Sequence, residues 1–251
     1  MLRAEDLQGK TALITGGSKG IGKAIAMFLA RAGCNTVVVS RNLSEAGEVA
    51  RQINENGGNS LALRADVTQR ADVVRMVEET VNRFSSIDIL INNAGTNIRK
   101  PLLELAEEEW DTVLDTNLKG IFLVGQQVGK IMVKQRGGKI INVASVAGVR
   151  GRPNLGAYCA SKGGVIQLTK VMALEWAEYN VQVNAIAPTY IETPLTSQYL
   201  LQVKDQVLKR IPIGRLGTME DLEGVVLLLA SKSSDFITGQ TFFIDGGGTA
   251  F

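Results

Sequence analysis

Short apolar runs alternate along the chain with longer segments in which apolar residues recur at every third or fourth position. The short runs predict β-strands at residues 11–15, 36–40, 60–63, 87–91, 139–143, 182–186 and 241–244. The longer segments predict helices at residues 21–32, 43–56, 70–84, 103–133 and 157–179. Strands that are apolar on both sides are typical of a parallel sheet whose two faces are covered. The pattern therefore predicts one doubly wound α/β domain over residues 1–251, with about seven parallel strands and helices on both faces of the sheet.

Residues 189–215 interrupt this alternation. The segment is long for a connection and mixes aromatic and aliphatic residues with polar ones. Long connections inside compact domains often cover a binding site. We therefore expect residues 189–215 to form a mobile lid over the substrate.

The composition excludes several kinds of chemistry. The chain has no histidine and two cysteines, which rules out a Ser-His-Asp triad, a Cys-His nucleophile and a histidine-ligated zinc, so no metal site is expected. So few cysteines also argue against a disulfide framework and for a reducing compartment. The formal net charge of +2, without a long basic run, argues against binding to nucleic acid or to an anionic membrane. Because the N-terminal stretch is charged and no apolar run is long enough to span a membrane, we expect a cytoplasmic protein.

A glycine-rich turn follows the first predicted strand and opens the first predicted helix. Its residues include Gly16, Ser18, Lys19, Gly20, Ile21 and Gly22. Helix N-termini bind anions through free backbone N–H groups, and glycine lets the backbone approach a phosphate closely. The spacing is G-x-x-x-G-x-G and not the dinucleotide fingerprint G-x-G-x-x-G, so a purely structural turn is the alternative. The position at the first strand-to-helix junction favours a phosphate site.

The end of the second predicted strand bears on the choice of dinucleotide. An acidic residue there would bind the ribose diol of NAD, whereas a basic residue suits the 2′-phosphate of NADP. The sequence has Ser40 and Arg41 at this place, and Lys19 lies in the glycine turn. We therefore expect NADP(H) as the preferred cofactor and NAD(H) as the alternative; the other interpretation is that both cations are solvated. Asp66 and Val67, after the third strand, either face the adenine or form a turn in which Asp66 is the cap.

Tyr158 and Lys162 lie four residues apart in a predicted helix and share one of its faces. The preceding strand ends near Ser145, and doubly wound sheets bind ligands at the carboxyl ends of their strands. A lysine cation about 4 Å from a phenol, at an effective dielectric of about 20, favours the phenolate by about 4 kcal/mol, or roughly three pKa units. We therefore expect Lys162 to lower the pKa of Tyr158. Ser145 either hydrogen-bonds the substrate oxygen as its charge changes or only satisfies the backbone at a strand end.

Together these residues resemble the short-chain dehydrogenase/reductase family. The matching motifs, in chain order, are 15–22, Asn92–Gly95, Asn117, Ser145, Tyr158-x-x-x-Lys162, Pro188 to Thr193, and 238–247. Each motif is weak alone, but the set extends over essentially the whole chain. The resemblance implies a Rossmann-type fold, hydride transfer to or from a nicotinamide, a small-molecule carbonyl or alcohol substrate, and a homotetramer.

The resemblance also implies roles for individual residues. Tyr158 would be the general acid/base, and Lys162 would lower its pKa and hold the nicotinamide ribose. Ser145 would polarise the carbonyl, and Asn117 would support a proton relay through water. The other residues that would contact the cofactor, on its adenine-ribose side or at the nicotinamide, are Asn93, Ala94, Gly95, Pro188, Ile191 and Thr193. This chain departs from the family pattern at Thr189, where many members have glycine, so the backbone path near the nicotinamide is open to question.

Two branches of the family fit the sequence. Residues 93–102, 173–177 and 209–212 are similar to sugar-acid and polyol dehydrogenases such as the gluconate 5-dehydrogenases, whereas residues 190–193 resemble 3-oxoacyl-(acyl-carrier-protein) reductases. Leu174 replaces a basic residue with which the second branch tends to contact its acidic carrier protein, so we favour the first branch, and a carrier protein is a partner only under the second. The basic residues Arg99, Lys100, Arg150 and Arg152 would meet a substrate carboxylate or be solvated. A non-catalytic nucleotide sensor of the same fold is the alternative outside enzymes.

Overall fold

The computed structural model describes residues 6–193 and 197–250 and confirms the parallel sheet predicted from the sequence. Within these residues, seven strands lie in the order β3-β2-β1-β4-β5-β6-β7, with all neighbours parallel. The strands are β1 Thr11–Thr15, β2 Asn35–Ser40, β3 Asn59–Arg64, β4 Ile89–Asn92, β5 Gly138–Val143, β6 Val181–Pro188 and β7 Thr241–Ile244. The strand order reverses between β1 and β4, which is where sheets of this kind open a crevice for ligands.

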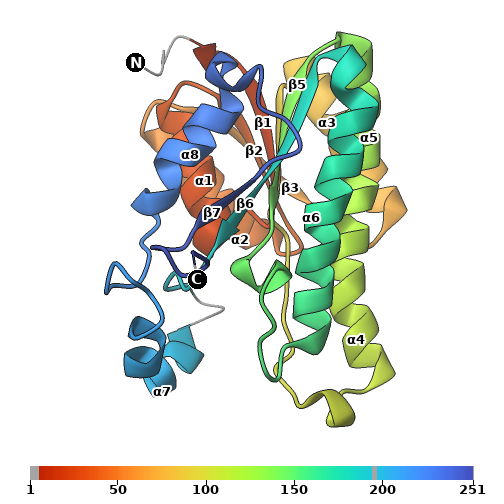
Figure 1. Cartoon of the computed structure of the whole chain (residues 1–251). Helices are drawn as coiled ribbons and strands as arrows, with labels where there is room; N and C mark the ends of the chain where they lie inside the picture. Colours follow the sequence, from red (N-terminus) through yellow and green to blue (C-terminus); the bar gives the residue numbers. More distant parts are fainter. Residues whose placement is uncertain (1–5, 194–196, 251) are drawn as a thin grey trace.

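Helices cover both faces of the sheet (Figure 1). Helices α1, α2 and α8 pack on one face, and α3, α5 and α6 pack on the other. The helices are α1 Gly20–Arg31, α2 Leu43–Glu55, α3 Arg70–Phe84, α4 Glu107–Leu114, α5 Gly120–Gln135, α6 Gly156–Trp176, α7 Ser197–Leu208 and α8 Glu220–Ala230. Helices α4 and α7 lie beyond the carboxyl ends of the strands, so they flank the same end of the sheet (Figure 1).

The core consists of two apolar layers, one on each side of the sheet. Along β1, Ala12 and Ile14 belong to the layer under α1, α2 and α8, while Leu13 belongs to the layer under α3, α5 and α6. All three side chains are fully buried. Because alternate residues of a strand point to opposite faces, a strand covered on both sides is apolar throughout. Full burial of one such leucine or isoleucine contributes about 1.5–3 kcal/mol, so this pattern fixes the sheet in the middle of the molecule.

The structure corrects the sequence-based boundaries in two places. The helix predicted at 103–133 is divided: α4 ends at Leu114, a π-helical turn follows at Asp115–Lys119, and α5 begins at Gly120. The spacing of apolar residues did not reveal this division, because the backbone stays helical through the π-helical turn. Helices α7 and α8 were not predicted. Residues 194–196 of the predicted lid lie outside the described residues, and its mobility stays a prediction. None of the described helices has the length and apolar character to cross a membrane.

Candidate active site

The glycine turn between β1 and α1 packs against the loop that follows β4. Gly16 and Gly20 have φ angles of 63° and 52°, in the left-handed region that favours glycine. A Cβ atom on Gly22 would lie 2.3 Å from the Gly16 carbonyl oxygen, and one on Gly16 would lie 2.8 Å from Ala94 Cα. Asn93 Nδ2 donates to the same Gly16 carbonyl at 2.9 Å. Only a chain without side chains at these positions leaves the backbone this close to the neighbouring loop.

The N-terminus of α1 opens onto this turn. Lys19 occupies the N-cap position and makes no side-chain capping hydrogen bond, so the first N–H groups of the helix have no side-chain cap. Exposed N–H groups at a helix N-terminus, with the positive end of the helix dipole behind them, attract phosphate. The residues present therefore fit the diphosphate of a dinucleotide.

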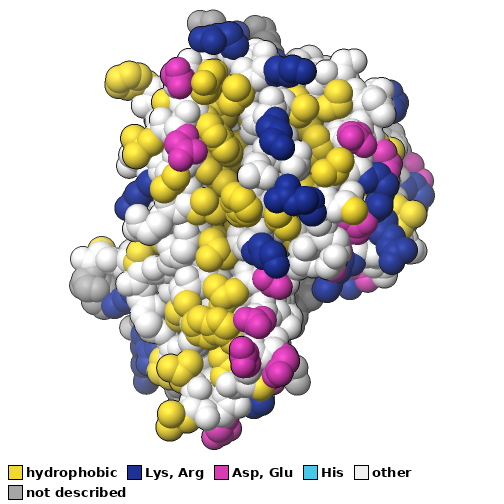
Figure 2. Space-filling view, turned by 90° about the vertical axis from the view of Figure 1, so that its right-hand side faces the viewer, with side chains coloured by type: hydrophobic (Ala, Val, Ile, Leu, Met, Phe, Trp, Pro, Cys, Tyr) yellow, Lys and Arg dark blue, Asp and Glu magenta, His cyan; other side chains and the backbone are white. Residues whose placement is uncertain are grey.

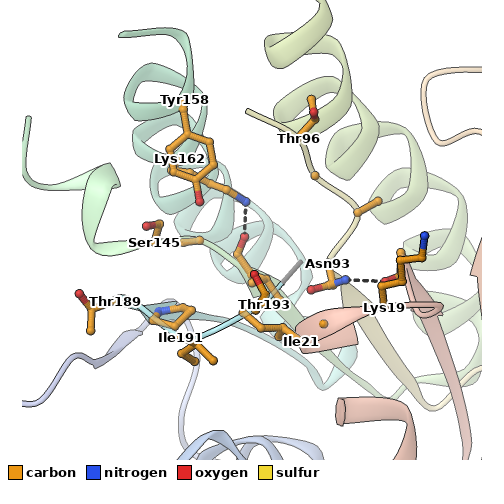
Figure 3. A pocket seen from close by; sticks show the side chains of 17 residues that line it. Lys19, Ile21, Asn93, Thr96, Ser145, Tyr158, Lys162, Thr189, Ile191 and Thr193 are labelled. Atoms are coloured by element: carbon orange, nitrogen blue, oxygen red, sulfur yellow. Dashed lines mark hydrogen bonds between the residues drawn. The ribbon is translucent and has the colours of Figure 1, made fainter. Parts of the chain in front are cut away.

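Two adjoining hollows at the carboxyl ends of the strands collect the residues predicted from the sequence. A cleft of about 430 Å³ is lined by Gly16, Lys19, Gly20, Ile21, Asn93, Ala94, Gly95, Ser145, Tyr158, Lys162, Pro188, Ile191 and Thr193 (Figure 3). A pocket of about 290 Å³ is lined by Ser18, Ser40, Arg41, Asp66 and Val67, and it shares Gly16 and Lys19 with the cleft. Gly22 and Asn117 are buried and line neither hollow.

Ser145, Tyr158 and Lys162 meet in the cleft (Figure 3). Tyr158 and Lys162 lie one turn apart on α6, and Lys162 Nζ is 5.7 Å from the centre of the Tyr158 ring. The ammonium group donates to the carbonyl oxygen of Val143, the last residue of β5, at 2.6 Å. Ser145 follows β5, its Oγ accepts from Ala147 N at 3.2 Å, and its hydroxyl lowers the pKa of the Tyr158 phenol. The end of β5 and one face of α6 thus place two hydroxyl groups and an ammonium group together.

Burial has the largest effect on the pKa of Tyr158. Burial raises the pKa of this phenol above its ordinary value, because the phenolate would lose its hydration. The hydrogen bond from Ser145 and the positive charge of Arg99 lower the pKa but do not outweigh burial. Burial also lowers the pKa of Lys162 to about 8. In this structure the desolvation of the phenol dominates its pKa, and the prediction that Lys162 lowers that pKa stays a prediction.

Asn117 does not line the cleft, but it hydrogen-bonds residues of the loop after β4 and of α6. It lies in the π-helical turn between α4 and α5 and is fully buried. Its Oδ1 accepts from Thr96 N at 2.8 Å, while its Nδ2 donates to Thr96 O at 2.9 Å and to Ser161 Oγ at 3.1 Å. Both amide hydrogens are therefore used to fix the loop after β4 to α6, and the proton relay implied for Asn117 stays a prediction.

Thr189, which stands where many family members have glycine, does not distort the backbone after β6. Thr189 N donates to Ile244 O at 3.2 Å, which extends the pairing of β6 with β7 past Pro188. Ile191 forms an isolated bridge with Gly217 and is buried. Thr189, Ile191 and the intervening backbone thus form one wall of the cleft without a glycine at this position.

The smaller pocket contains a residue that the sequence analysis did not single out. Glu45, in the first turn of α2, lines this pocket, and its Oε1 lies 2.8 Å from Lys19 Nζ. Ser18 Oγ lies 3.1 Å from Ser40 Oγ and 3.4 Å from Glu45 Oε2, within hydrogen-bond distance of both. The pattern Asn42-x-x-Glu45 is a helix-start signal that could have located this acid beside the end of β2.

Asp66 combines the two interpretations that the sequence left open. Its Oδ1 accepts from Thr68 N at 2.9 Å and from Thr68 Oγ1 at 2.8 Å, which is a turn-capping arrangement. The same residue lines the smaller pocket, together with Val67. The capped turn therefore forms part of that pocket's wall.

A third hollow, of about 220 Å³, is lined by Arg99, Arg152, Tyr190 and Arg210. The guanidinium carbon of Arg152 lies 5.4 Å from the centre of the Tyr190 ring. The other two basic residues singled out from the sequence lie elsewhere. Lys100 pairs with Glu109 at 2.9 Å, and Arg150 donates to the carbonyl oxygen of Gly248. The positive charge of Arg99, which lines this hollow, lowers the pKa of Tyr158.

Comparison with known proteins agrees with this geometry. Residues 16–249 match the family profile described as Enoyl-(Acyl carrier protein) reductase. The 3-oxoacyl-(acyl-carrier-protein) reductase of Thermotoga maritima is 41% identical over 241 residues, with 96% of this chain and 98% of that protein covered. The corresponding Staphylococcus epidermidis enzyme is 42% identical over 239 residues, with 95% and 98% covered.

Solved structures give the same result. A gluconate 5-dehydrogenase from Burkholderia cenocepacia, in complex with NADP and tartrate, has a TM-score of 0.96 at 40% identity, with 100% of this chain and 99% of that chain covered. A short-chain dehydrogenase/reductase from Mycobacterium marinum has a TM-score of 0.95, also at 40% identity, with 100% and 99% covered. The chain belongs to the short-chain dehydrogenase/reductase family, and it is an oxidoreductase of the class that uses NAD(P).

Proposed function

We propose that the chain transfers hydride between NADP(H) and a ketone or secondary alcohol, and that its substrate is a sugar acid or polyol. The observation that carries the reaction class is the meeting of Ser145, Tyr158 and Lys162 in the cleft that the glycine turn opens onto. When bound, the nicotinamide supplies or accepts the hydride. The chain's own residues then handle the proton and the charge on the substrate oxygen.

Each catalytic residue has a distinct task in this proposal. In reduction, Ser145 donates a hydrogen bond to the carbonyl oxygen, and Tyr158 gives that oxygen its proton. The raised pKa of Tyr158 keeps the phenol protonated at neutral pH, as a proton donor must be. Lys162, with a pKa of about 8, is predominantly an ammonium at neutral pH and is held by Val143 O beside the cleft. There it would hold the nicotinamide ribose, and Asn117 would support the return of protons through water.

The arginine-lined hollow supports an anionic substrate. Arg99, Arg152 and Arg210 present three guanidinium groups, which bind carboxylates well because their donors are fixed in a planar fork. The B. cenocepacia relative, whose structure includes NADP and the dicarboxylate tartrate, is consistent with this substrate class. The alternative substrate is a 3-oxoacyl group on a carrier protein, which the names of the T. maritima and S. epidermidis relatives favour.

A substrate panel separates these alternatives. NADPH oxidation would be followed with a keto-sugar acid, a neutral ketose and a 3-oxoacyl thioester, with Arg152→Gln beside the unmodified protein. We expect turnover with the keto-sugar acid and a rise of about tenfold in KM for Arg152→Gln, as expected for the loss of one charged hydrogen bond. Preferential turnover of the thioester would replace the sugar-acid proposal by the acyl one. Cofactor binding without turnover of any substrate would favour the nucleotide sensor.

The preference for NADP(H) rests on the smaller pocket, with NAD(H) as the alternative cofactor. Ser18, Ser40 and Arg41 line it, and no acidic residue ends β2. These groups offer hydroxyl and guanidinium donors to a 2′-phosphate.

The family expectation of a homotetramer has support on the surface. Figure 2 shows hydrophobic side chains gathered along the face formed by α4, α5 and α6. Its exposed apolar residues include Trp110, Phe122, Val171 and Leu174, of which Leu174 is 82% exposed. Large exposed apolar patches are typical of protein–protein contacts, so we propose that copies of the chain pack through this face. A cytoplasmic location stays a prediction.

A further inference from the structure

A carboxylate stands among the groups that would bind the 2′-phosphate. Glu45 Oε1 lies 2.8 Å from Lys19 Nζ, and Glu45 Oε2 accepts from Ser18 Oγ at 3.4 Å. The backbone holds this carboxylate in place, because Glu45 N donates to Asn42 Oδ1 at the start of α2. The Lys19 side chain is 61% exposed and that of Glu45 33% exposed, so the ion pair lies at the mouth of the pocket and can be reached by a ligand.

This ion pair changes the charge that an incoming cofactor meets. The charged residues that line the pocket are Lys19, Arg41, Glu45 and Asp66, so its two positive and two negative charges cancel. A 2′-phosphate carries close to two negative charges at neutral pH. It would approach the Glu45 carboxylate directly, and it would have to compete with Glu45 for the Lys19 ammonium and the Ser18 hydroxyl. NAD(H) has a 2′-hydroxyl at that position, which a carboxylate can accept as a hydrogen bond.

We propose that Glu45 is a cofactor-selecting residue that weakens binding of NADP(H) relative to NAD(H). With NAD(H), the Lys19–Glu45 ion pair stays closed, and the Glu45 carboxylate accepts from the ribose diol in place of the acid that β2 lacks. With NADP(H), Lys19 leaves Glu45 for the 2′-phosphate. This proposal rests on dinucleotide binding in the smaller pocket, as proposed above, and it makes the chain less selective for NADP(H) than Ser40 and Arg41 alone would make it.

Glu45→Gln tests the proposal with little change in shape. The amide keeps an acceptor for the ribose hydroxyl but loses the charge that holds Lys19 and repels phosphate. We expect NADP⁺ to bind about fivefold more tightly, the upper end of what one solvent-exposed charge pair supplies, and NAD⁺ to bind within about twofold of the unmodified protein. Calorimetric dissociation constants give this comparison without turnover. The smaller probes 2′,5′-ADP and 5′-AMP should show the same contrast, because they differ by the 2′-phosphate alone.

The matched control is Glu48→Gln. Glu48 lies on the same helix, pairs with Arg51 at 2.7 Å, and does not line the pocket. The Glu48→Gln variant removes the same charge from the same helix, but outside the pocket. It should therefore leave the ratio of the NADP⁺ and NAD⁺ dissociation constants unchanged. An unchanged ratio in Glu45→Gln, or an equal change in Glu48→Gln, would overturn the proposal. If neither dinucleotide bound to the unmodified protein, the proposed function itself would fail, which is a distinct outcome.

A double-mutant comparison tests the coupling between the two side chains. Lys19→Met should weaken NADP⁺ binding more in the Glu45→Gln background than in the unmodified protein, because there Lys19 is no longer shared with a carboxylate. An equal loss of NADP⁺ affinity in both backgrounds would mean that Lys19 and Glu45 act independently. The proposal that Lys19 leaves Glu45 for the 2′-phosphate would then be wrong.

Discussion

Ser145 and Tyr158 line the same cleft, and the Ser145 hydroxyl acts on the pKa of the Tyr158 phenol. Burial raises the pKa of Tyr158, and the hydrogen bond from Ser145 opposes this rise. A protonated phenol donates a proton in carbonyl reduction, whereas alcohol oxidation needs the phenolate as a base. If Tyr158 is the general acid/base, as proposed, we expect faster reduction at neutral pH and faster oxidation only as the pH rises towards the raised pKa of Tyr158.

Ser145→Ala should move the alkaline limb of the oxidation profile. Without the hydrogen bond that stabilises the phenolate, the pKa of Tyr158 rises further, so kcat/KM for alcohol oxidation should increase only at higher pH than in the unmodified protein. Ser145→Thr keeps a hydroxyl and should leave the limb close to its original position. A pH–rate profile from neutral to alkaline pH makes the measurement. If Ser145→Ala lowered the rate equally at every pH, the serine would act on the substrate alone.

At the residue scale, the sequence located the catalytic candidates but not their electrostatics. The spacing of Tyr158 and Lys162 predicts a shared helix face, and the structure bears this out. The rise of the Tyr158 pKa through burial was not predicted, because the burial of a phenol depends on what packs around it. Glu45 was missed for a similar reason: it meets Lys19 across 26 residues of sequence, through the packing of α2 beside α1.

At the element scale, the turn from β1 into α1 is the part of the fold proposed to bind the cofactor. The β–α alternation and the glycine pattern predicted this junction, and the structure adds the reason for the glycines: the turn touches both its own helix and the loop after β4. The break between α4 and α5 could not be read from periodicity. In the structure the break is a π-helical turn, and this turn places Asn117 against the backbone of Thr96.

Gly22→Ala should disrupt this junction. The new Cβ would lie 2.3 Å from the Gly16 carbonyl oxygen, which forces the turn to move away from the helix N-terminus. We expect a loss of at least about 1–3 kcal/mol in the free energy of unfolding, in the range of an overpacked core site, and at least tenfold weaker binding of NADP⁺. Chemical denaturation and calorimetry measure the two effects.

Gly47→Ala provides the control for this change. Gly47 lies within α2, and a Cβ there would meet nothing within 4 Å. Alanine in an open helix position should stabilise the protein by about 0.5–1 kcal/mol and leave cofactor binding unchanged. Similar behaviour of the two variants would contradict the close packing of the glycine turn.

At the scale of the whole molecule, hydrophobic side chains gather on the face formed by α4, α5 and α6 (Figure 2). Leu174 lies on α6, the same helix that carries Tyr158 and Lys162. Packing between copies at this face would therefore hold the helix that positions the catalytic side chains. The sequence drew attention to Leu174 as a departure from a basic residue, and the structure shows that its side chain is 82% exposed.

Leu174→Glu should lower the oligomeric state. A carboxylate in an apolar contact between copies would have to be buried without a partner, which is strongly unfavourable. Sedimentation velocity should give a homotetramer for the unmodified protein and a smaller species for this variant. Leu43→Glu, on α2 and 50% exposed, introduces the same charge outside this face and should leave sedimentation unchanged. A single sedimenting species common to all three proteins would refute the proposed contact.

The rate of NADPH oxidation by Tyr158→Phe, measured beside the unmodified protein on the keto-substrate that it reduces best, is the most direct test of proton transfer by this phenol. The variant removes one oxygen atom and keeps the ring in its place on α6. We predict a fall in kcat of about 10²–10⁴-fold, the usual contribution of a general acid, with the dissociation constant of NADPH nearly unchanged. A variant that reduces the substrate at the original rate would contradict the account.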